Sequence, residues 1–257
     1  MTTTTIKIAG IDLELFDAGQ GPPLLWLHGA PGFNPKHEFV DLIAARRRLI
    51  APSHPGFGKS SLPDWLDSVD DIAHVYLELL DRLDLKQVDV VGTSLGGWIA
   101  ADMASKVPER IRRLVLVGPV GVKVGSPDKL DIPDIFAMPQ DAVNTLIYHD
   151  PEKMKVDLAK LPEDELAAMF RNRETLALLV WEPWMHNPKL KRRLHRAAMP
   201  ALFVRGESDG LVSAEYLAAY AKLLPKARTL TIPAAGHAPQ QEQPQALVKT
   251  VMDFLDA

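Results

Sequence analysis

The Gly-x-Ser-x-Gly segment at residues 92–96 carries the clearest chemical signal in the chain. It follows a short apolar run, 88–91, and precedes a stretch with helical periodicity. Such a turn between a strand and a helix forces its serine into a strained conformation, so the positions two residues away need glycine. The serine hydroxyl then projects at the amino end of a helix, where developing negative charge is favoured. We therefore predict that Ser94 is the nucleophile of an acyl-transfer reaction.

A serine needs a base and an acid that orients the base, because its hydroxyl is a poor nucleophile at its ordinary pKa. Of eight histidines, His237 lies in a short loop directly after the last strand-like run. Asp209 follows the preceding run, in a turn that also contains Glu207. The chain order is serine, acid, histidine, which is typical of one fold in particular. We predict Ser94, Asp209 and His237 as a catalytic triad, with Glu207 as the rival acid.

These motifs resemble those of the α/β-hydrolase superfamily, in its serine-nucleophile branch with an inserted helical cap. The sequence His-Gly-Ala-Pro-Gly at 28–32 is similar to the oxyanion loop of that family. The resemblance implies that the backbone N–H groups of Ala30 and Leu95 bind the oxyanion. It also implies activities such as those of carboxylesterases and meta-cleavage-product hydrolases.

Two further segments carry the same resemblance. The sequence SHPGFGKS at 53–60 is similar to the family's Asp-x-Pro-Gly-x-Gly-x-Ser loop, with Ser53 in place of the aspartate. The Gly-His pair followed by Glu242 and Pro244 matches the histidine loop. Serine at position 94 excludes the members with an aspartate nucleophile, the epoxide hydrolases and haloalkane dehalogenases. Gly118 leaves no acid at the end of the neighbouring strand.

Strands and helices in alternation must position these loops. Continuous apolar runs are typical of strands buried on both faces of a parallel sheet, and they lie at 23–27, 48–51, 88–91, 114–117, 201–204 and 230–232. An alternating hairpin pattern over 6–15 precedes them. Helical stretches at 72–83, 95–106, 216–224 and 245–255 separate or follow the runs. This order predicts an α/β fold, with a mostly parallel sheet of about eight strands and helices on both faces.

The interval from 122 to 197 has no strand-like run, and a structureless loop of that length is implausible in a compact domain. Prolines open three helical stretches, at 140–148, 163–184 and 189–198, the last amphipathic and basic. We predict a helical cap at 122–197 between two parts of the α/β-hydrolase core, 1–121 and 198–257. Its substrate-binding candidates are three aromatic side chains to line the pocket and an arginine to hold a carboxylate: Phe170, Trp181, Trp184 and Arg171.

Composition narrows the classes of partner. Apolar residues make up 47% and charged residues 24% of 257, which excludes global disorder. A net charge of −4 lacks the basic excess typical of duplex nucleic-acid binders. The chain has no cysteine, so disulfides, thiolate catalysis and cysteine-ligated metals are excluded. The predicted mechanism needs no cofactor or metal. Without a signal peptide or a long apolar run, we expect a cytoplasmic monomer or homodimer that acts on a small molecule, with no membrane or nucleic-acid partner.

The leading hypothesis is a serine esterase with an acyl-enzyme intermediate. Three alternatives stay open: a carbon–carbon bond hydrolase of aromatic ring-fission products, a lactonase, and a non-catalytic ligand-binding homologue. Carbon–carbon hydrolases that resemble this chain typically carry tryptophan directly after the catalytic histidine, where this chain has Ala238. That difference favours ester cleavage, whereas Arg171 and Arg173 with Trp181 favour a carboxylated, conjugated substrate.

Overall fold

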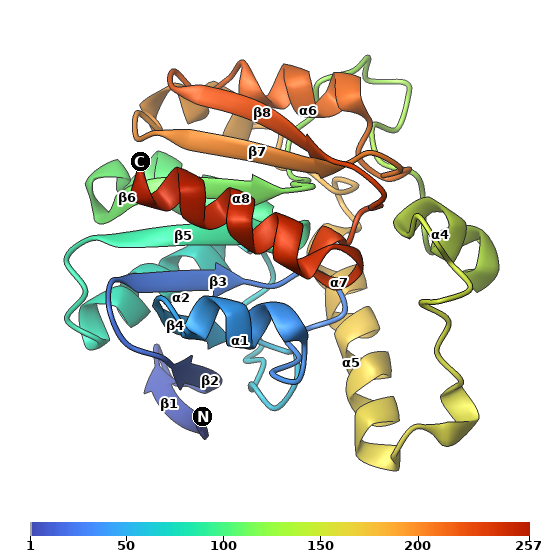
Figure 1. The fold of residues 1–257 in the computed structure, drawn as a ribbon, viewed down its shortest axis with the longest axis horizontal. Helices are drawn as coiled ribbons and strands as arrows, with labels where there is room; N and C mark the ends of the chain where they lie inside the picture. Colours follow the sequence, from blue (N-terminus) through green and yellow to red (C-terminus); the bar gives the residue numbers. More distant parts are fainter. Residues whose placement is uncertain (1) are drawn as a thin grey trace.

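One mixed sheet of eight strands organises the protein in the computed structural model, which describes residues 2–257 (Figure 1). The strand order is β1-β2-β4-β3-β5-β6-β7-β8. The first two strands form an antiparallel hairpin, and β2 is also antiparallel to β4. The other six strands, in the order β4-β3-β5-β6-β7-β8, are parallel to one another. The predicted fold class is therefore confirmed.

Each strand-like run of the sequence lies within one of the observed strands. These are β1 (Thr2–Ile8), β2 (Ile11–Ala18), β3 (Pro23–Leu27), β4 (Arg48–Pro52), β5 (Val88–Thr93), β6 (Ile111–Val117), β7 (Ala201–Gly206) and β8 (Ala227–Ile232). The central strand β5 is buried along its whole length. Burial on both faces explains why its sequence is a continuous apolar run rather than an alternating one.

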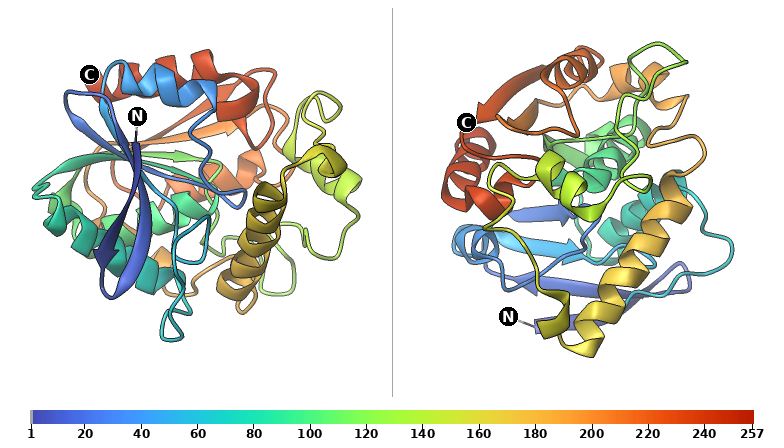
Figure 2. Two further views of the ribbon diagram at one scale, coloured as in Figure 1. Left: turned by 90° about the horizontal axis from the view of Figure 1, so that it is seen from below. Right: turned by 90° about the vertical axis from the view of Figure 1, so that its right-hand side faces the viewer.

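Helices cover both faces of the sheet (Figure 2). One face carries α1 (Glu38–Ala44) and α8 (Pro244–Asp256), and the other carries α2 (Val69–Arg82), α3 (Leu95–Lys106) and α6 (Ala214–Ala221). Each group buries its apolar side chains in a separate core against the sheet. The short helix α1 was not predicted, since seven residues make only about two turns and leave little periodicity to detect.

Much of the interval between β6 and β7 lies beyond the carboxyl ends of the parallel strands, at the right of Figure 1. It contains α4 (Gln140–Ile147), α5 (Glu163–Val180) and three short 3-10 helices, η2 (Leu158–Lys160), η3 (Leu190–Arg192) and η4 (Leu194–Arg196). The predicted helix at 189–198 is wrong. Leu190 and Leu194 are fully buried, as their spacing suggested, but each belongs to its own tight turn, and η4 packs on α3.

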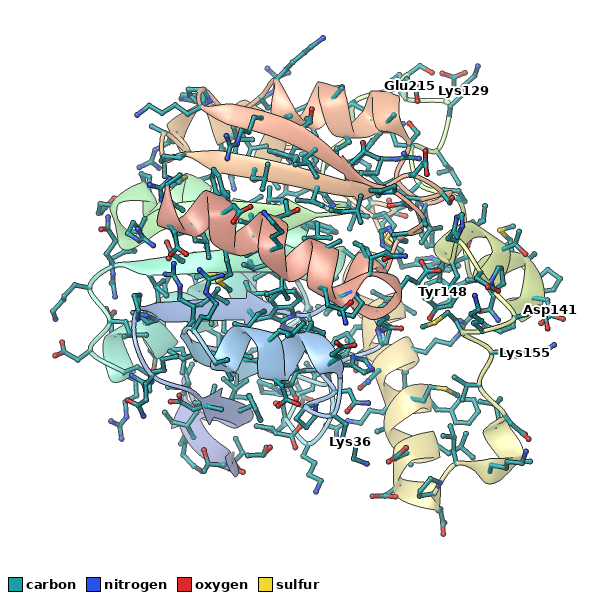
Figure 3. All side chains as sticks on the ribbon, viewed as in Figure 1. Lys36, Lys129, Asp141, Tyr148, Lys155 and Glu215 are labelled. Atoms are coloured by element: carbon teal, nitrogen blue, oxygen red, sulfur yellow. The ribbon has the colours of Figure 1, made fainter. Side chains whose placement is uncertain are left out.

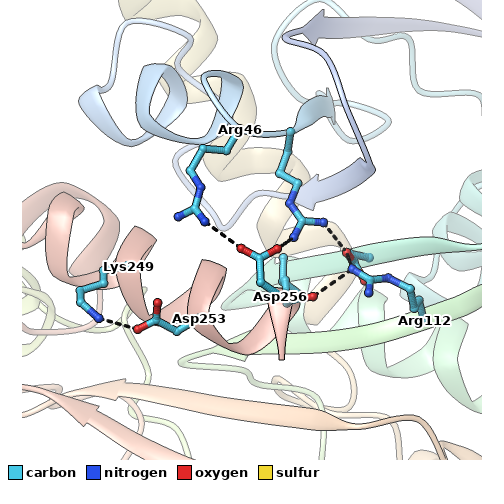
Figure 4. Close-up of polar contacts among 8 residues, drawn as sticks. Arg46, Arg112, Lys249, Asp253 and Asp256 are labelled. Carbon is cyan, nitrogen blue, oxygen red and sulfur yellow. Dashed lines mark hydrogen bonds and ion pairs between the residues drawn. The ribbon is translucent and has the colours of Figure 1, made fainter.

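At the opposite end of the sheet, where the parallel strands begin, a network of ion pairs joins the strands to their surroundings (Figure 4). Asp89 on β5 accepts hydrogen bonds from Arg47 at 3.0 Å and from Arg112. Asp256, in the last turn of α8, pairs with Arg46 at 2.7 Å and with Arg47. These contacts tie the C-terminal helix to the start of the central strands.

Candidate active site

Ser94 lies at a sharp turn between β5 and α3. Its backbone has φ 51° and ψ −113°, a conformation that is strained for any residue other than glycine. A Cβ atom on Gly96 would lie 2.1 Å from the carbonyl oxygen of Leu27, and one on Gly92 would lie 2.3 Å from that of Gly96. Both flanking positions therefore require glycine for a steric reason, as the motif predicted.

His237 and Asp209 meet at the carboxyl ends of β8 and β7. The Nδ1 atom of His237 lies 2.9 Å from Asp209 Oδ2, and Asp209 is only 3% exposed. The other carboxylate oxygen accepts the backbone N–H groups of Leu211 and Val212, each at 2.9 Å. Because an ionised carboxylate only accepts hydrogen bonds, His237 carries its proton on Nδ1. Its Nε2 atom is buried and meets no donor from residues 2–257.

The rival acid Glu207 does not contact His237. Its side chain is exposed and accepts the backbone N–H of Ala234 at 3.3 Å. Gly118 provides the space in which the pair of Asp209 and His237 lies, because a Cβ atom there would come within 3.0 Å of the imidazole. The observed partner of the histidine is therefore Asp209.

The cavity beside these residues is lined by Ser94, His237 and both residues predicted for the oxyanion hole, Ala30 and Leu95. Leu95 is the first residue of α3, so its N–H has no acceptor within the helix. A Cβ atom on Gly29 would lie 3.2 Å from the Cβ of Ser94, which shows how closely the oxyanion loop approaches the serine.

Two buried histidines fasten the loop at residues 28–32, which was predicted to bind the oxyanion. His28 Nδ1–H donates to the carbonyl oxygen of Gly29 at 2.7 Å, and its Nε2 accepts the backbone N–H of His54 at 2.9 Å. In return, His54 Nε2–H donates to the carbonyl oxygen of His28 at 2.8 Å, and the rings stack with centroids 3.6 Å apart. Burial lowers the pKa of His28 to about 4. The pKa of His54 is well below its ordinary value, because of burial and then of repulsion from His28.

The loop with serine in place of the family's aspartate receives its carboxylate from another strand. Ser53 donates to Glu14 Oε2 at 2.8 Å, and the backbone N–H of Lys59 donates to the same oxygen at 3.1 Å. The sequence held no signal for this role of Glu14, since it lies on β2, far from the loop along the chain.

The last residues of α4 hold the two loops that carry His237 and Asp209. The carbonyl oxygen of Ile147 accepts the N–H of His237 at 2.6 Å, and that of Leu146 accepts the N–H of Gly210 at 2.8 Å. Tyr148, which follows α4, lines the cavity, whereas Asp141 lies on the outer side of the helix (Figure 3). No sequence pattern predicts these contacts, because they involve backbone atoms of residues far apart in the chain.

The prediction that the cap aromatics line the pocket needs correction. Phe170 and Trp181 are each 58% exposed, and neither lines the cavity. Phe170 lies on the outward face of α5, whose inward face carries Leu176 and Leu179, and Trp181 directly follows this helix. Trp184 is partly buried and donates from its indole N–H to the carbonyl oxygen of Ile132 at 2.9 Å, again outside the cavity lining.

Arg171 also has a different role from the predicted one. It donates to the carbonyl oxygens of Gly58 at 3.0 Å and Ser60 at 2.6 Å, and thereby docks α5 on the loop at 53–60. Arg173 lies over the ring of Phe136, 4.9 Å from its centroid. Among the described residues, no arginine or lysine lines the cavity. The groups that do roof it are apolar side chains such as Ile132, Ile135, Leu176 and Met185.

Two negative findings apply to residues 2–257. No three histidine, aspartate or glutamate side chains are arranged there to hold a metal ion. None of the helices in that range has the length and apolar character needed to cross a bilayer.

Comparison with known proteins places this geometry in a family. The chain is 29% identical to 2-hydroxymuconate semialdehyde hydrolase from Pseudomonas sp. (strain CF600), over 97% of this chain and 92% of that protein. It is 28% identical to a 2-hydroxy-6-oxo-2,4-heptadienoate hydrolase from Pseudomonas putida, with 98% and 95% covered.

Solved structures agree on the fold. A meta-cleavage product hydrolase from Pseudomonas fluorescens IP01 has a TM-score of 0.79 at 20% identity, with 98% of this chain and 97% of that chain covered. A thermophilic esterase from Thermogutta terrifontis has a TM-score of 0.75 at 20% identity, with 100% and 98% covered. Residues 24–250 match the alpha/beta hydrolase family. The chain therefore belongs to the alpha/beta hydrolase family.

Proposed function

We propose that the protein is a serine hydrolase that cleaves a small, neutral carboxylic ester through an acyl-enzyme. One observation carries the proposal. His237 is bound through Nδ1 to Asp209, while its Nε2 is buried in the cavity that Ser94 lines and accepts no hydrogen bond from residues 2–257, Ser94 included. An imidazole with this tautomer is a base for the hydroxyl of Ser94.

In this mechanism, Ser94 Oγ attacks the ester carbonyl carbon as His237 Nε2 takes its proton. The carbonyl oxygen becomes an oxyanion, which the N–H groups of Ala30 and Leu95 stabilise. The imidazolium then returns the proton to the departing alcohol oxygen and leaves an acyl-serine. A water molecule, deprotonated by His237, then attacks the acyl carbon. The bond from this carbon to Ser94 Oγ breaks, the imidazolium returns the proton to Oγ, and the acid is released.

The described residues that line the cavity include no lysine or arginine, and this supports a neutral substrate. A carboxylate bound among the apolar roof residues would need a cationic partner to offset its desolvation. Arg171 and Arg173, the residues considered for that task, are directed to backbone carbonyls and an aromatic ring instead. This argument favours a neutral ester over a carboxylated dienone.

A second candidate is hydrolysis of a carbon–carbon bond. The relatives named above as hydrolases of muconate semialdehyde and oxoheptadienoate favour it, because the similarity extends over nearly the whole of both chains. The same triad serves that reaction, so the choice between the two depends on how the substrate is bound.

Two measurements test the proposal in turn. A fluorophosphonate probe should label the wild type and fail to label Ser94→Ala; unlabelled wild type, or labelled Ser94→Ala, would overturn the serine mechanism. The kcat/KM for p-nitrophenyl butyrate is then compared with that for a phenyl-substituted ring-fission dienone. A value for the dienone more than about tenfold higher would replace the ester with the carbon–carbon bond.

A further inference from the structure

The polarity of the cavity lining differs between the side chains from the β6–β7 interval and those from α7. The part contributed by the β6–β7 interval is apolar apart from Tyr148, as Leu176 and Met185 illustrate. The short helix α7 (Pro239–Glu242) adds two side-chain amides, Gln240 and Gln241. Hydrogen-bonding groups in a largely apolar cavity are the usual means of orienting a ligand.

Gln240 differs from the other amides in this region because its oxygen is buried without a partner. No donor from residues 2–257 reaches Gln240 Oε1. By contrast, Gln243 donates to the carbonyl oxygen of Ala234 at 3.0 Å, and Asn34 accepts the N–H of Lys36 at 2.9 Å. A buried amide oxygen without a donor is costly for the folded protein. A ligand that supplies a donor recovers this free energy on binding.

The position of Gln240 connects this amide to the reaction. It lies three residues after His237, and both line the same cavity as Ser94. A substrate whose carbonyl lies at Ser94 therefore occupies the cavity that Gln240 also lines. The partner group is neutral, since no lysine or arginine lines the cavity among the described residues and burial lowers the pKa of the nearby lining residue His37.

We propose that Gln240 is a specificity-determining residue that binds a neutral hydrogen-bonding group of the substrate, an amide or a hydroxyl, placed a few atoms from the scissile carbonyl. The inference rests on the proposed ester hydrolysis and specifies its substrate class. A primary amide offers an acceptor oxygen and, on the same group, a donor N–H₂, so it pairs with either partner.

Two matched pairs of esters test the proposal on the whole protein. On the acyl side, p-nitrophenyl N-acetylglycinate is compared with p-nitrophenyl 4-methylpentanoate, which has the same shape without the amide. On the alcohol side, the butyrate of 2-acetamidoethanol is compared with 4-methylpentyl butyrate. After subtraction of spontaneous hydrolysis, we expect the kcat/KM ratio of the amide to the apolar ester to exceed one in at least one pair. In Gln240→Leu, that ratio should fall by about tenfold.

Gln245→Leu is the matched control, because Gln245 lies exposed on α8 outside the cavity lining. Its ratios should equal those of the wild type. Wild type and Gln240→Leu with the same ratio in both pairs would overturn the inference while leaving ester hydrolysis intact. Failure of the wild type to hydrolyse any of the four esters would instead refute the proposed function. In that case the role of Gln240 is tested by binding alone. Calorimetry compares the affinity of N-acetylglycinamide for Ser94→Ala with that for Ser94→Ala/Gln240→Leu. Equal affinities would overturn the inference, and weaker binding to the double variant would support it.

Discussion

The two ends of the sheet bury a carboxylate in opposite ways. At the amino ends, Asp89 on β5 is 1% exposed and contacts two arginines, Arg47 and Arg112. At the carboxyl ends, Asp209 is 3% exposed, and its carboxylate contacts a histidine and two backbone N–H groups. Arginine stays charged at all ordinary pH values, whereas histidine changes charge near neutrality.

This difference separates a structural carboxylate from a chemical one. A permanent ion pair holds the amino ends of the strands together but has no proton to exchange. The carboxylate at the carboxyl ends is positioned by uncharged backbone groups, and in the proposed mechanism it stabilises an imidazolium that appears only during reaction. The two residues thus predict opposite phenotypes when they are replaced.

The largest expected effect is on turnover. Asp209→Asn should lower kcat by about 10³–10⁴-fold while thermal unfolding changes little, because the imidazole tautomer is no longer held. Steady-state assays on p-nitrophenyl butyrate measure this. Glu207→Gln is the control and should cost far less. A larger loss of kcat in Glu207→Gln than in Asp209→Asn would show that Glu207, and not Asp209, is the acid.

At the other end of the sheet, the expected effect is on stability. Asp89→Ala leaves the buried guanidinium of Arg47 with only Asp256 as a partner and should lower the free energy of unfolding by about 3–5 kcal/mol. Urea titration measures the loss. Asp253→Ala, which breaks the exposed pair with Lys249 (Figure 4), should cost at most about 1 kcal/mol. Equal losses in the two variants would refute the contrast.

The histidine pair under the oxyanion loop predicts a pH-dependent stability. The pKa of His28 is about 4 in the folded protein, against 6.5 for an exposed histidine. Between these values the unfolded chain binds protons that the folded protein excludes, so stability falls as the pH is lowered from 6.5 toward 4. For His28 alone, the loss is about 3 kcal/mol over the whole window.

Urea titrations at several pH values between 5 and 6.5 test this dependence. The His54→Phe variant lacks one of the two buried histidines that bind a proton in the unfolded chain but not in the folded protein. The slope of its unfolding free energy against pH should therefore decrease by up to about 1.4 kcal/mol per pH unit. His195→Phe, at an exposed position on η4, is the control and should keep the wild-type slope. An unchanged slope in His54→Phe would mean that this histidine is protonated in the folded state.

The smallest effect is expected on the outward face of α5. Phe170→Ala should change kcat/KM by less than about twofold, since the side chain is exposed and does not line the cavity. Leu176→Ala on the inner face of the same helix removes part of the cavity lining and should raise KM for p-nitrophenyl butyrate several-fold. A larger effect from Phe170 than from Leu176 would show that α5 presents its other face to the substrate.

Local pattern was sufficient for much of the fold. The elbow glycines, the apolar strands and the order of serine, acid and histidine could be predicted, because each depends on neighbours within a few residues or on the sequence order of the loops. Predictions for the cap were weaker. The aromatic side chains of Phe170 and Trp181, in a helical interval expected to face Ser94, favour a place in the pocket lining, whereas the face that a helix presents depends on what it docks against.

By itself, the sequence determined the eight-stranded α/β core and the loops that carry Ser94, Asp209 and His237, since steric limits on backbone geometry and burial leave few alternatives there. Only the tertiary structure decided that Asp209 rather than Glu207 contacts the histidine, and that Arg171 binds backbone carbonyls. It also decided that the missing loop carboxylate comes from Glu14 on β2. Such contacts join residues far apart in the chain, and a hydrogen bond needs a partner at about 3 Å in the right direction, which no local pattern encodes.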